Sequence, residues 1–275
     1  MEFSPFNFGG IKNQNFEKAK IVILPIPFEE TTDFIKGTIA APEAIISASR
    51  DLDEIYQKKI PIFTFDEIEL EGEGVKEKMA DLEKLVSQIL EKNKIPILIG
   101  GEHTITLGSI LAFREKYSDF SILQLDAHCD LLNEYKKSKY NYATVMRRVK
   151  ELGIEIVPVG VRSIDPETES YLKKEKIKIF EPPKIPLKKI LKKLKKNVYL
   201  TVDLDVFDPS IMPSVSNPVP GGFGWYEVLD LIDNLAKNKN IIGVDLVEFC
   251  PIPGLEAPNF LAAKLIYKII EYIFK

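Results

Sequence analysis

The stretch FSILQLDAHCD at residues 120–130 joins an apolar run to three side chains of the kinds that bind metal ions. The run 120–125 is typical of a largely buried strand. Asp126, His128 and Asp130 follow at alternate positions, and alternate residues of an extended chain point to one face. Taken alone, the stretch also fits one ion pair at a strand end. In an open α/β sheet, however, ligands bind at the carboxyl ends of strands, and this position favours a ligand site.

A second β-rich run, VYLTV, ends in the pair Asp203 and Asp205. These two carboxylates share one face by the same alternation. Unpaired carboxylates are costly to remove from water, so two strands that both end in them predict a cation between the strands.

The histidines give a third indication. The chain has two, and each directly follows an apolar run: His103 comes after residues 95–99, and His128 after residues 120–125. A single histidine is more often a core or surface residue than a ligand. We expect both to be ligands, because the whole histidine content lies at two such strand ends.

Strand and helix patterns alternate along the chain, which is typical of a parallel sheet covered on both faces. We predict a single domain over residues 1–275, with residues 1–19 as an N-terminal arm, and an α/β fold of three layers (α/β/α) around a mostly parallel sheet of about eight strands. The expected strands are 20–25, 60–65, 95–99, 120–126, 154–159, 177–180, 198–203 and 241–247. The expected helices are 42–55, 75–91, 104–117, 144–152, 167–174, 187–195, 226–236 and 259–273.

Composition argues against several classes of function. A formal net charge of −4 disfavours binding to nucleic acid. Two cysteines provide no disulfide framework and indicate a reducing, cytoplasmic location. We expect no signal peptide and no membrane span, since the most apolar helix carries Lys264, Lys268 and Glu271. The lysine run 188–196 has apolar residues at helical spacing and is best interpreted as the solvated face of a helix.

The candidate ligands combine four carboxylates with two imidazoles, and none is a thiolate: His103, Asp126, His128, Asp130, Asp203 and Asp205. This set favours Mn²⁺, Fe²⁺, Co²⁺ or Zn²⁺ in a reactive site over a structural zinc site. Six ligands are too many for one ion and suit two ions with bridging carboxylates. Two dications balance the four negative charges and lower the pKa of a shared water, which predicts hydrolysis at an electrophilic carbon.

Taken together, several blocks of the chain resemble the arginase/agmatinase (ureohydrolase) family over roughly residues 20–270. The blocks are 100–103 (GGEH), 126–130 (DAHCD), 201–209 (TVDLDVFDP), 213–222 and 245–251 (DLVEFCP), and 145–148 (VMRR) resembles the agmatinase-like branch. The resemblance implies an arginase/deacetylase-like fold, two Mn²⁺ per chain, a small guanidino substrate and a homo-oligomer, either a trimer or a hexamer.

The resemblance also implies roles for individual residues. His103 and Asp130 would bind one manganese and His128 and Asp205 the other, while Asp126 and Asp203 would bridge the two. Asp130 would in addition orient the attacking water, and Glu248 would hold the substrate guanidinium.

The family usually carries a proton-transferring histidine where this chain has Tyr142. Tyr142 is a candidate catalytic residue because a tyrosine can donate a hydrogen bond, but it titrates near pH 10 and is a poor proton shuttle at neutral pH. The main hypothesis is a binuclear-manganese amidinohydrolase that cleaves agmatine to putrescine and urea, as a step in polyamine biosynthesis, or cleaves a close relative such as aminopropylagmatine. Two alternatives stay open: a metal-binding homologue with little activity, and a deacetylase-type amide hydrolase with one zinc ion and a catalytic tyrosine.

Overall fold

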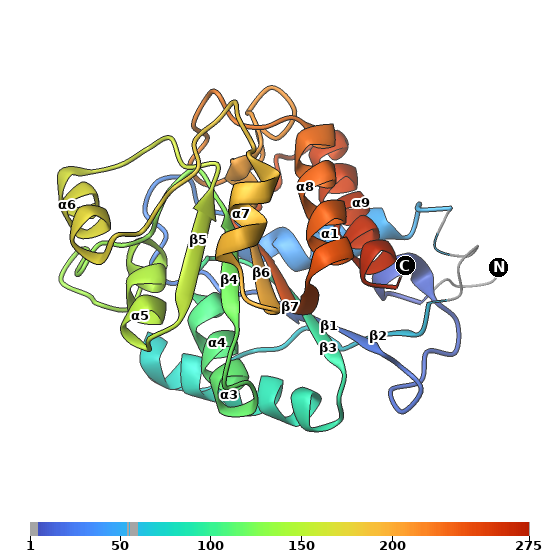
Figure 1. The fold of residues 1–275 in the computed structure, drawn as a ribbon. Coiled ribbons are helices and arrows are strands. Elements are labelled where there is room, and N and C mark those ends of the chain that lie inside the picture. The colour runs from blue at the N-terminus through green and yellow to red at the C-terminus, as the bar shows by residue number, and fades with distance from the viewer. Residues whose placement is uncertain (1–4, 54, 56–59, 275) are drawn as a thin grey trace.

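The fold is a seven-stranded sheet between two layers of helices (Figure 1). A computed structural model describes residues 5–53, 55 and 60–274. All strand pairs in this part of the chain are parallel, and the strand order is β2-β1-β3-β7-β6-β4-β5. The strands are β1 (Ile21–Ile26), β2 (Ile62–Thr64), β3 (Ile95–Gly100), β4 (Ser121–Leu125), β5 (Glu155–Val159), β6 (Asn197–Asp203) and β7 (Asn240–Val247).

The order of the strands brings the predicted motifs together. Strands β3, β7, β6 and β4 are neighbours at the centre of the sheet, although their chain order is different. Because parallel strands all end at the same edge, the four segments that follow these strands meet at one place. The chain passes from β3 at one side of this group to β4 at the other, which opens a crevice of the kind in which α/β sheets bind ligands.

Each face of the sheet has its own apolar core. One core packs beneath α1 (Ala41–Ser49), α7 (Leu187–Lys193), α8 (Trp225–Asn238) and α9 (Glu256–Ile273). The other packs beneath α3 (Val75–Glu91), α4 (Ile105–Lys116), α5 (Val145–Glu151) and α6 (Pro166–Glu175). In Figure 1, α3 and α4 lie below the sheet, and α8 and α9 lie above it. The strands are buried on both faces, as expected for a parallel sheet.

The predicted three-layer fold is confirmed, but the prediction of an eighth strand, at residues 177–180, is wrong. Residues 177–180 form no strand and pair with the sheet edge only at a bridge between Val159 and Phe180. Phe180 N–H donates to the carbonyl of Pro158 over 3.0 Å, and Gly160 N–H donates to the carbonyl of Phe180 over 2.8 Å. The next bond of such a ladder would need an N–H at Pro158, which proline lacks. The pairing therefore stops after one bridge.

The helix predicted over residues 42–55 is also shorter than expected, since α1 ends at Ser49. The N–H groups of Asp51 and Leu52 bond three residues back, to Ala48 and Ser49, as in the tighter turns that close many helices. Residue 54 of the expected range lies outside the described residues. Among the helices described, none has both the length and the unbroken apolar character that crossing a bilayer requires.

Candidate metal and substrate site

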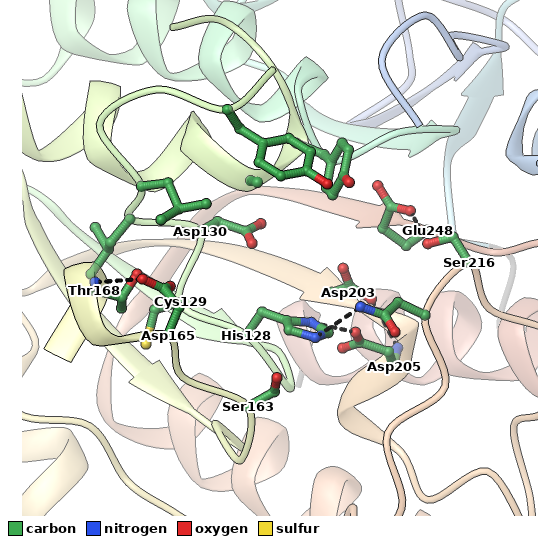
Figure 2. A pocket seen from close by; sticks show the side chains of 16 residues that line it. His128, Cys129, Asp130, Ser163, Asp165, Thr168, Asp203, Asp205, Ser216 and Glu248 are labelled. Atoms are coloured by element: carbon green, nitrogen blue, oxygen red, sulfur yellow. Dashed lines mark hydrogen bonds and ion pairs between the residues drawn. The ribbon is translucent and has the colours of Figure 1, made fainter. Parts of the chain in front are cut away.

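The six predicted ligands lie together at the carboxyl edge of the central strands. His103 follows β3, Asp126, His128 and Asp130 follow β4, and the end of β6 supplies Asp203 and Asp205. Five of these side chains form two groups with the geometry to hold a metal ion, one of His103, Asp126 and Asp203 and the other of Asp126, His128 and Asp205. Asp130 lies beside the first group, with Oδ2 3.0 Å from Nδ1 of His103. Glu248, directly after β7, lines the same pocket (Figure 2).

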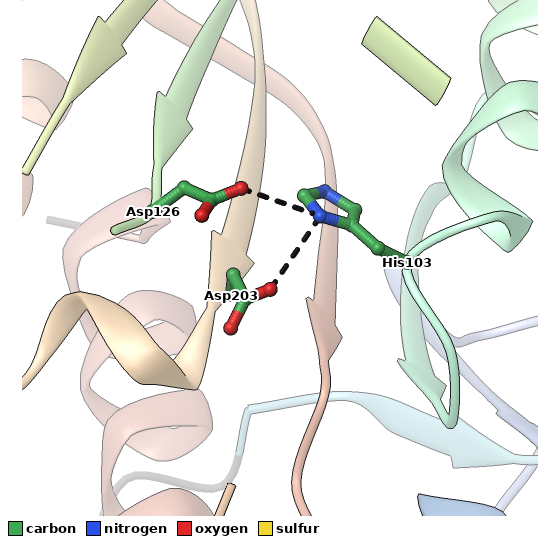
Figure 3. Close-up of side chains that lie close together, drawn as sticks. All are labelled: His103, Asp126 and Asp203. Carbon is green, nitrogen blue, oxygen red and sulfur yellow. Dashed lines mark ion pairs between the residues drawn. The ribbon is translucent and has the colours of Figure 1, made fainter. Parts of the chain in front are cut away.

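The first group is centred on His103, which is fully buried (Figure 3). Its Nδ1 atom lies 3.0 Å from Asp130 Oδ2, 3.4 Å from Asp126 Oδ2 and 3.6 Å from Asp203 Oδ2. None of these three ion-pair contacts meets the geometry of a hydrogen bond, so Nδ1 is buried without a hydrogen-bond partner. A buried nitrogen that faces three carboxylate oxygens without a hydrogen bond is typical of a group of ligands that surround one cation.

The second group is centred on His128. The Nδ1 atom of its ring lies 2.9 Å from Asp205 Oδ2 and 3.6 Å from Asp126 Oδ1. Asp126 thus contributes one carboxylate oxygen to each group, as a bridging ligand would. Asp203 faces His103, and its other oxygen accepts the N–H of Asp205 over 2.9 Å. The donor set of carboxylates and imidazoles fits divalent metals that prefer N and O ligands.

The side chains converge for a different reason from the one that alternation suggested. Strand β4 ends at Leu125, so Asp126, His128 and Asp130 lie in the loop that follows. Asp126 Oδ1 accepts the N–H of His128, and Asp203 does the same for Asp205, so each acidic residue turns its own chain. Turns formed by aspartate side chains, and not extended strand, direct the ligands to one point.

Two functional candidates have left-handed backbones. Asp130 has a φ of 53° and Glu248 a φ of 62°. Such values are uncommon for residues other than glycine and cost free energy. The surrounding hydrogen bonds maintain the conformation: Glu248 N–H donates to the carbonyl of Gly101 over 2.8 Å, and the N–H of Arg147 donates to the carbonyl of Asp130 over 3.1 Å.

Burial and the neighbouring charges shift the pKa values of the side chains in this cluster. Burial raises the pKa of Asp126 to about 7, and the charges of Asp130 and Asp205 add to this effect. Burial, with the charges of Asp205 and Asp126, also raises the pKa of Asp203 well above its usual range. Burial alone would lower the pKa of His128, but Asp205 and Asp126 outweigh it and raise that pKa to about 12. Without a metal, the raised pKa values favour protons bound to Asp126, Asp203 and His128 at the places where metal ions would bind.

Sequence patterns missed the residues that orient the two imidazoles. Thr201 Oγ1 lies 2.9 Å from Nε2 of His103, and Asn217 Nδ2 lies 3.1 Å from Nε2 of His128. Such contacts fix the ring of a metal-binding histidine. Thr201 precedes Asp203 by two residues in β6, so the strand pattern could have found it. Asn217 lies in a long loop where no periodic pattern applies.

Arg162 is a second residue that the sequence patterns missed. Its half-buried guanidinium donates to the carbonyls of Asp205 and Val219, both over 2.6 Å, and of Phe207 over 3.2 Å. These bonds join the turn after β6 to the loop that carries Asn217. Arg162 thereby holds these two segments of the pocket in place, although it does not line the pocket itself.

Glu248 faces the pocket but is almost fully buried. Its Oε1 accepts the N–H of His103 over 2.7 Å, and its Oε2 accepts the hydroxyl of Ser216. Burial raises the pKa of Glu248 to about 8, although the bond from Ser216 opposes the shift. A cation in the pocket would return this group to its charged form.

Tyr142 lines the same pocket of about 220 Å³, but its hydroxyl is engaged elsewhere. It donates to Asp33 Oδ1 over 2.6 Å. Burial and the neighbouring Asp33 raise the pKa of the phenol further, so it stays protonated at neutral pH. Its predicted catalytic role stays a prediction, and its established contact is with the N-terminal loop.

Comparisons with known proteins agree with this geometry. The family model described as "Arginase family" matches residues 19–271. The chain belongs to the arginase family. It is 34% identical to an N(1)-aminopropylagmatine ureohydrolase of Synechocystis sp., over 94% of this chain and 90% of the relative. It is 31% identical to an agmatinase of Bacillus cereus, over 86% of each chain.

The fold matches a solved member of the same group. The agmatine ureohydrolase of Thermoplasma volcanium superposes with a TM-score of 0.88 at 29% identity, over 100% of this chain and 95% of that one. The family resemblance and the α/β fold predicted from the sequence are confirmed. The family match and the two groups of ligand side chains support the expected divalent-metal site.

We predict that metal binding to the metal-free protein releases protons. The aspartates raise the pKa values of His103 and His128, which favours the protonated rings, and a protonated ring must lose a proton to bind a metal. Calorimetric titration with Mn²⁺ in buffers of different ionisation enthalpy measures the number released. The apparent affinity should rise from pH 6 to pH 8; an affinity that falls, or no proton release, would contradict these shifts.

Proposed function

We propose that this chain is a urea-releasing hydrolase that cleaves a linear guanidino compound with an amine at its far end, either agmatine or N(1)-aminopropylagmatine. The observation that carries the proposal is the buried pair of ligand groups that share Asp126 and open into the pocket lined by Glu248. The names of the relatives support the choice of substrate class. Two overlapping ligand groups also favour a two-metal site over the single zinc of a deacetylase.

We infer that two Mn²⁺ ions occupy the site. His103, Asp130, Asp126 and Asp203 would hold one ion, and His128 and Asp205 would hold the other together with the shared carboxylates. Bound metals would supply a water of lowered pKa at neutral pH. The chain's own residues perform the remaining steps.

Glu248 is the residue that would bind the guanidinium. A carboxylate and a guanidinium form paired, directional hydrogen bonds that fix the plane of the ligand. The bonds from Ser216 and from the N–H of His103 prevent Glu248 from rotating, so the substrate's central carbon would be held in one orientation toward the aspartates.

Asp130 is the candidate for proton transfer. Its side chain is 9% exposed, and it lines the pocket beside His103. It would accept a proton from the attacking water and deliver it to the leaving nitrogen, as the C–N bond breaks and urea and an amine form. Tyr142 is not assigned this role, because its hydroxyl donates to Asp33.

Glu248→Gln tests the assignment of the guanidinium-binding residue. With Mn²⁺-loaded protein, the wild type should release urea from agmatine or N(1)-aminopropylagmatine. The variant should lose about 100-fold or more in kcat/KM, because a neutral amide cannot pair with the cation. The matched control is Glu91→Gln at the exposed end of α3, which should retain wild-type activity. Release of urea from no member of a guanidino panel would overturn the proposed function.

Tyr142→His tests the alternative that this chain is a metal-binding homologue with little activity because it lacks the family's histidine. We expect no gain in rate, because the change removes a hydroxyl that is bonded to Asp33 and Asp130 already supplies the proposed proton transfer. The measurement is kcat for urea release from agmatine across pH 6 to 9. An increase of about tenfold or more would instead indicate that the wild-type chain lacks a proton shuttle and has little activity.

A further inference from the structure

We propose that Asp33 recognises the ammonium group at the far end of the substrate and so selects guanidino compounds that end in an amine. The proposal rests on the function proposed above and deepens it. Asp33 and Glu248 line one continuous cavity of about 370 Å³. One carboxylate would bind the guanidinium, and the other would bind the second cationic group of the same molecule.

The position of Asp33 is fixed by a buried residue next to the candidate ligand His103. Glu102, the fully buried neighbour of His103, accepts the N–H groups of Glu30, Thr31 and Thr32 over 3.0, 2.6 and 3.1 Å with one carboxylate oxygen. Three consecutive N–H groups on one oxygen hold the loop in a single conformation. Asp33 is the next residue, so the loop presents its side chain at the pocket.

Two tyrosines orient the Asp33 carboxylate. The hydroxyl of Tyr142 donates to Oδ1 over 2.6 Å, and that of Tyr135 donates to Oδ2 over 2.7 Å. The two rings meet edge to face, with centroids 5.8 Å apart. Although burial opposes it, hydrogen bonds from Lys136, Tyr142 and Tyr135 lower the pKa of Asp33 to about 2. Asp33 is therefore an anion at any physiological pH.

The structure already contains an ammonium group at this place. Lys136 Nζ pairs with Asp33 Oδ2 and lies 5.8 Å from the centroid of the Tyr135 ring. A carboxylate beside an aromatic face is a favourable environment for a cationic amine. The Lys136 side chain is 62% exposed, and exposed ion pairs of this kind are weak. A substrate ammonium, already held at its other end by Glu248, can displace it.

Ammonium recognition by Asp33 gives a function to Tyr142, which stands where the family usually has a histidine. A histidine at this position would lose the phenol that completes the Asp33 environment. Tyr142 is a specificity element in the lining of this cavity, and proton transfer is left to the aspartate cluster.

The test compares three guanidines with the same four-carbon chain: agmatine, which ends in an ammonium, n-butylguanidine, which ends in a methyl group, and 4-guanidinobutyrate, which ends in a carboxylate. For Asp33→Asn, we expect kcat/KM for agmatine to fall about tenfold or more, while that for butylguanidine changes less than about threefold. The amide oxygen still accepts from one tyrosine and the amide NH2 can donate to the hydroxyl oxygen of the other, so the loop should keep its fold. Asp119→Asn, an exposed aspartate paired with Lys195, is the matched control and should change neither value.

A charge-reversing variant provides a second readout. Asp33→Lys should favour 4-guanidinobutyrate over agmatine relative to the wild type. Equal losses for charged and neutral substrates in Asp33→Asn, or no loss for agmatine, would overturn the inference.

Binding separates failure of this inference from failure of the proposed function. If the metal-loaded wild type released no urea, the function would be wrong, but Asp33 could still be tested by calorimetry with 1,4-diaminobutane. Asp33→Asn should weaken that binding about tenfold, and Lys136→Met should strengthen it by removing the competing cation. Unchanged affinity in both variants would contradict a role for Asp33 in ammonium recognition.

Discussion

Repulsion among four aspartates is the constraint on which the rest of this structure depends. Asp126, Asp203 and Asp205 are at most 3% exposed, and Asp130 lies beside them. Removing such charges from water costs several kcal/mol each unless cations compensate, roughly as for any buried ion. The two histidines offset part of this cost as imidazolium groups, and two divalent metals would offset it more fully. The arrangement therefore favours the binding of cations.

Much of the fold was predictable because parallel strands buried on both faces leave long apolar runs in the sequence. Seven of the eight predicted strands are present. The eighth failed at Pro158, whose missing N–H ends the pairing with residues 177–180, and no run of apolar residues records that constraint. The early end of α1 at Ser49 likewise depends on local turns that periodicity does not detect.

The ligands were predictable from residue type and position, but their mutual contacts were not. Alternation suggested that Asp126, His128 and Asp130 share a strand face, whereas Asp130 has a left-handed backbone in the loop after β4. The link from Glu102 to the loop that carries Asp33 joins residues about 70 positions apart, and Arg162 acts through carbonyl groups. Contacts of this range depend on the assembled sheet, so a motif in one segment cannot reveal them.

The most direct test of the central claim is the number and position of metal ions. A crystal of the Mn²⁺-loaded protein, with anomalous diffraction recorded at the manganese edge, locates each ion. We predict two peaks per chain on either side of Asp126, one beside His103 and one beside His128. A single peak, or two ions that do not share Asp126, would contradict that prediction.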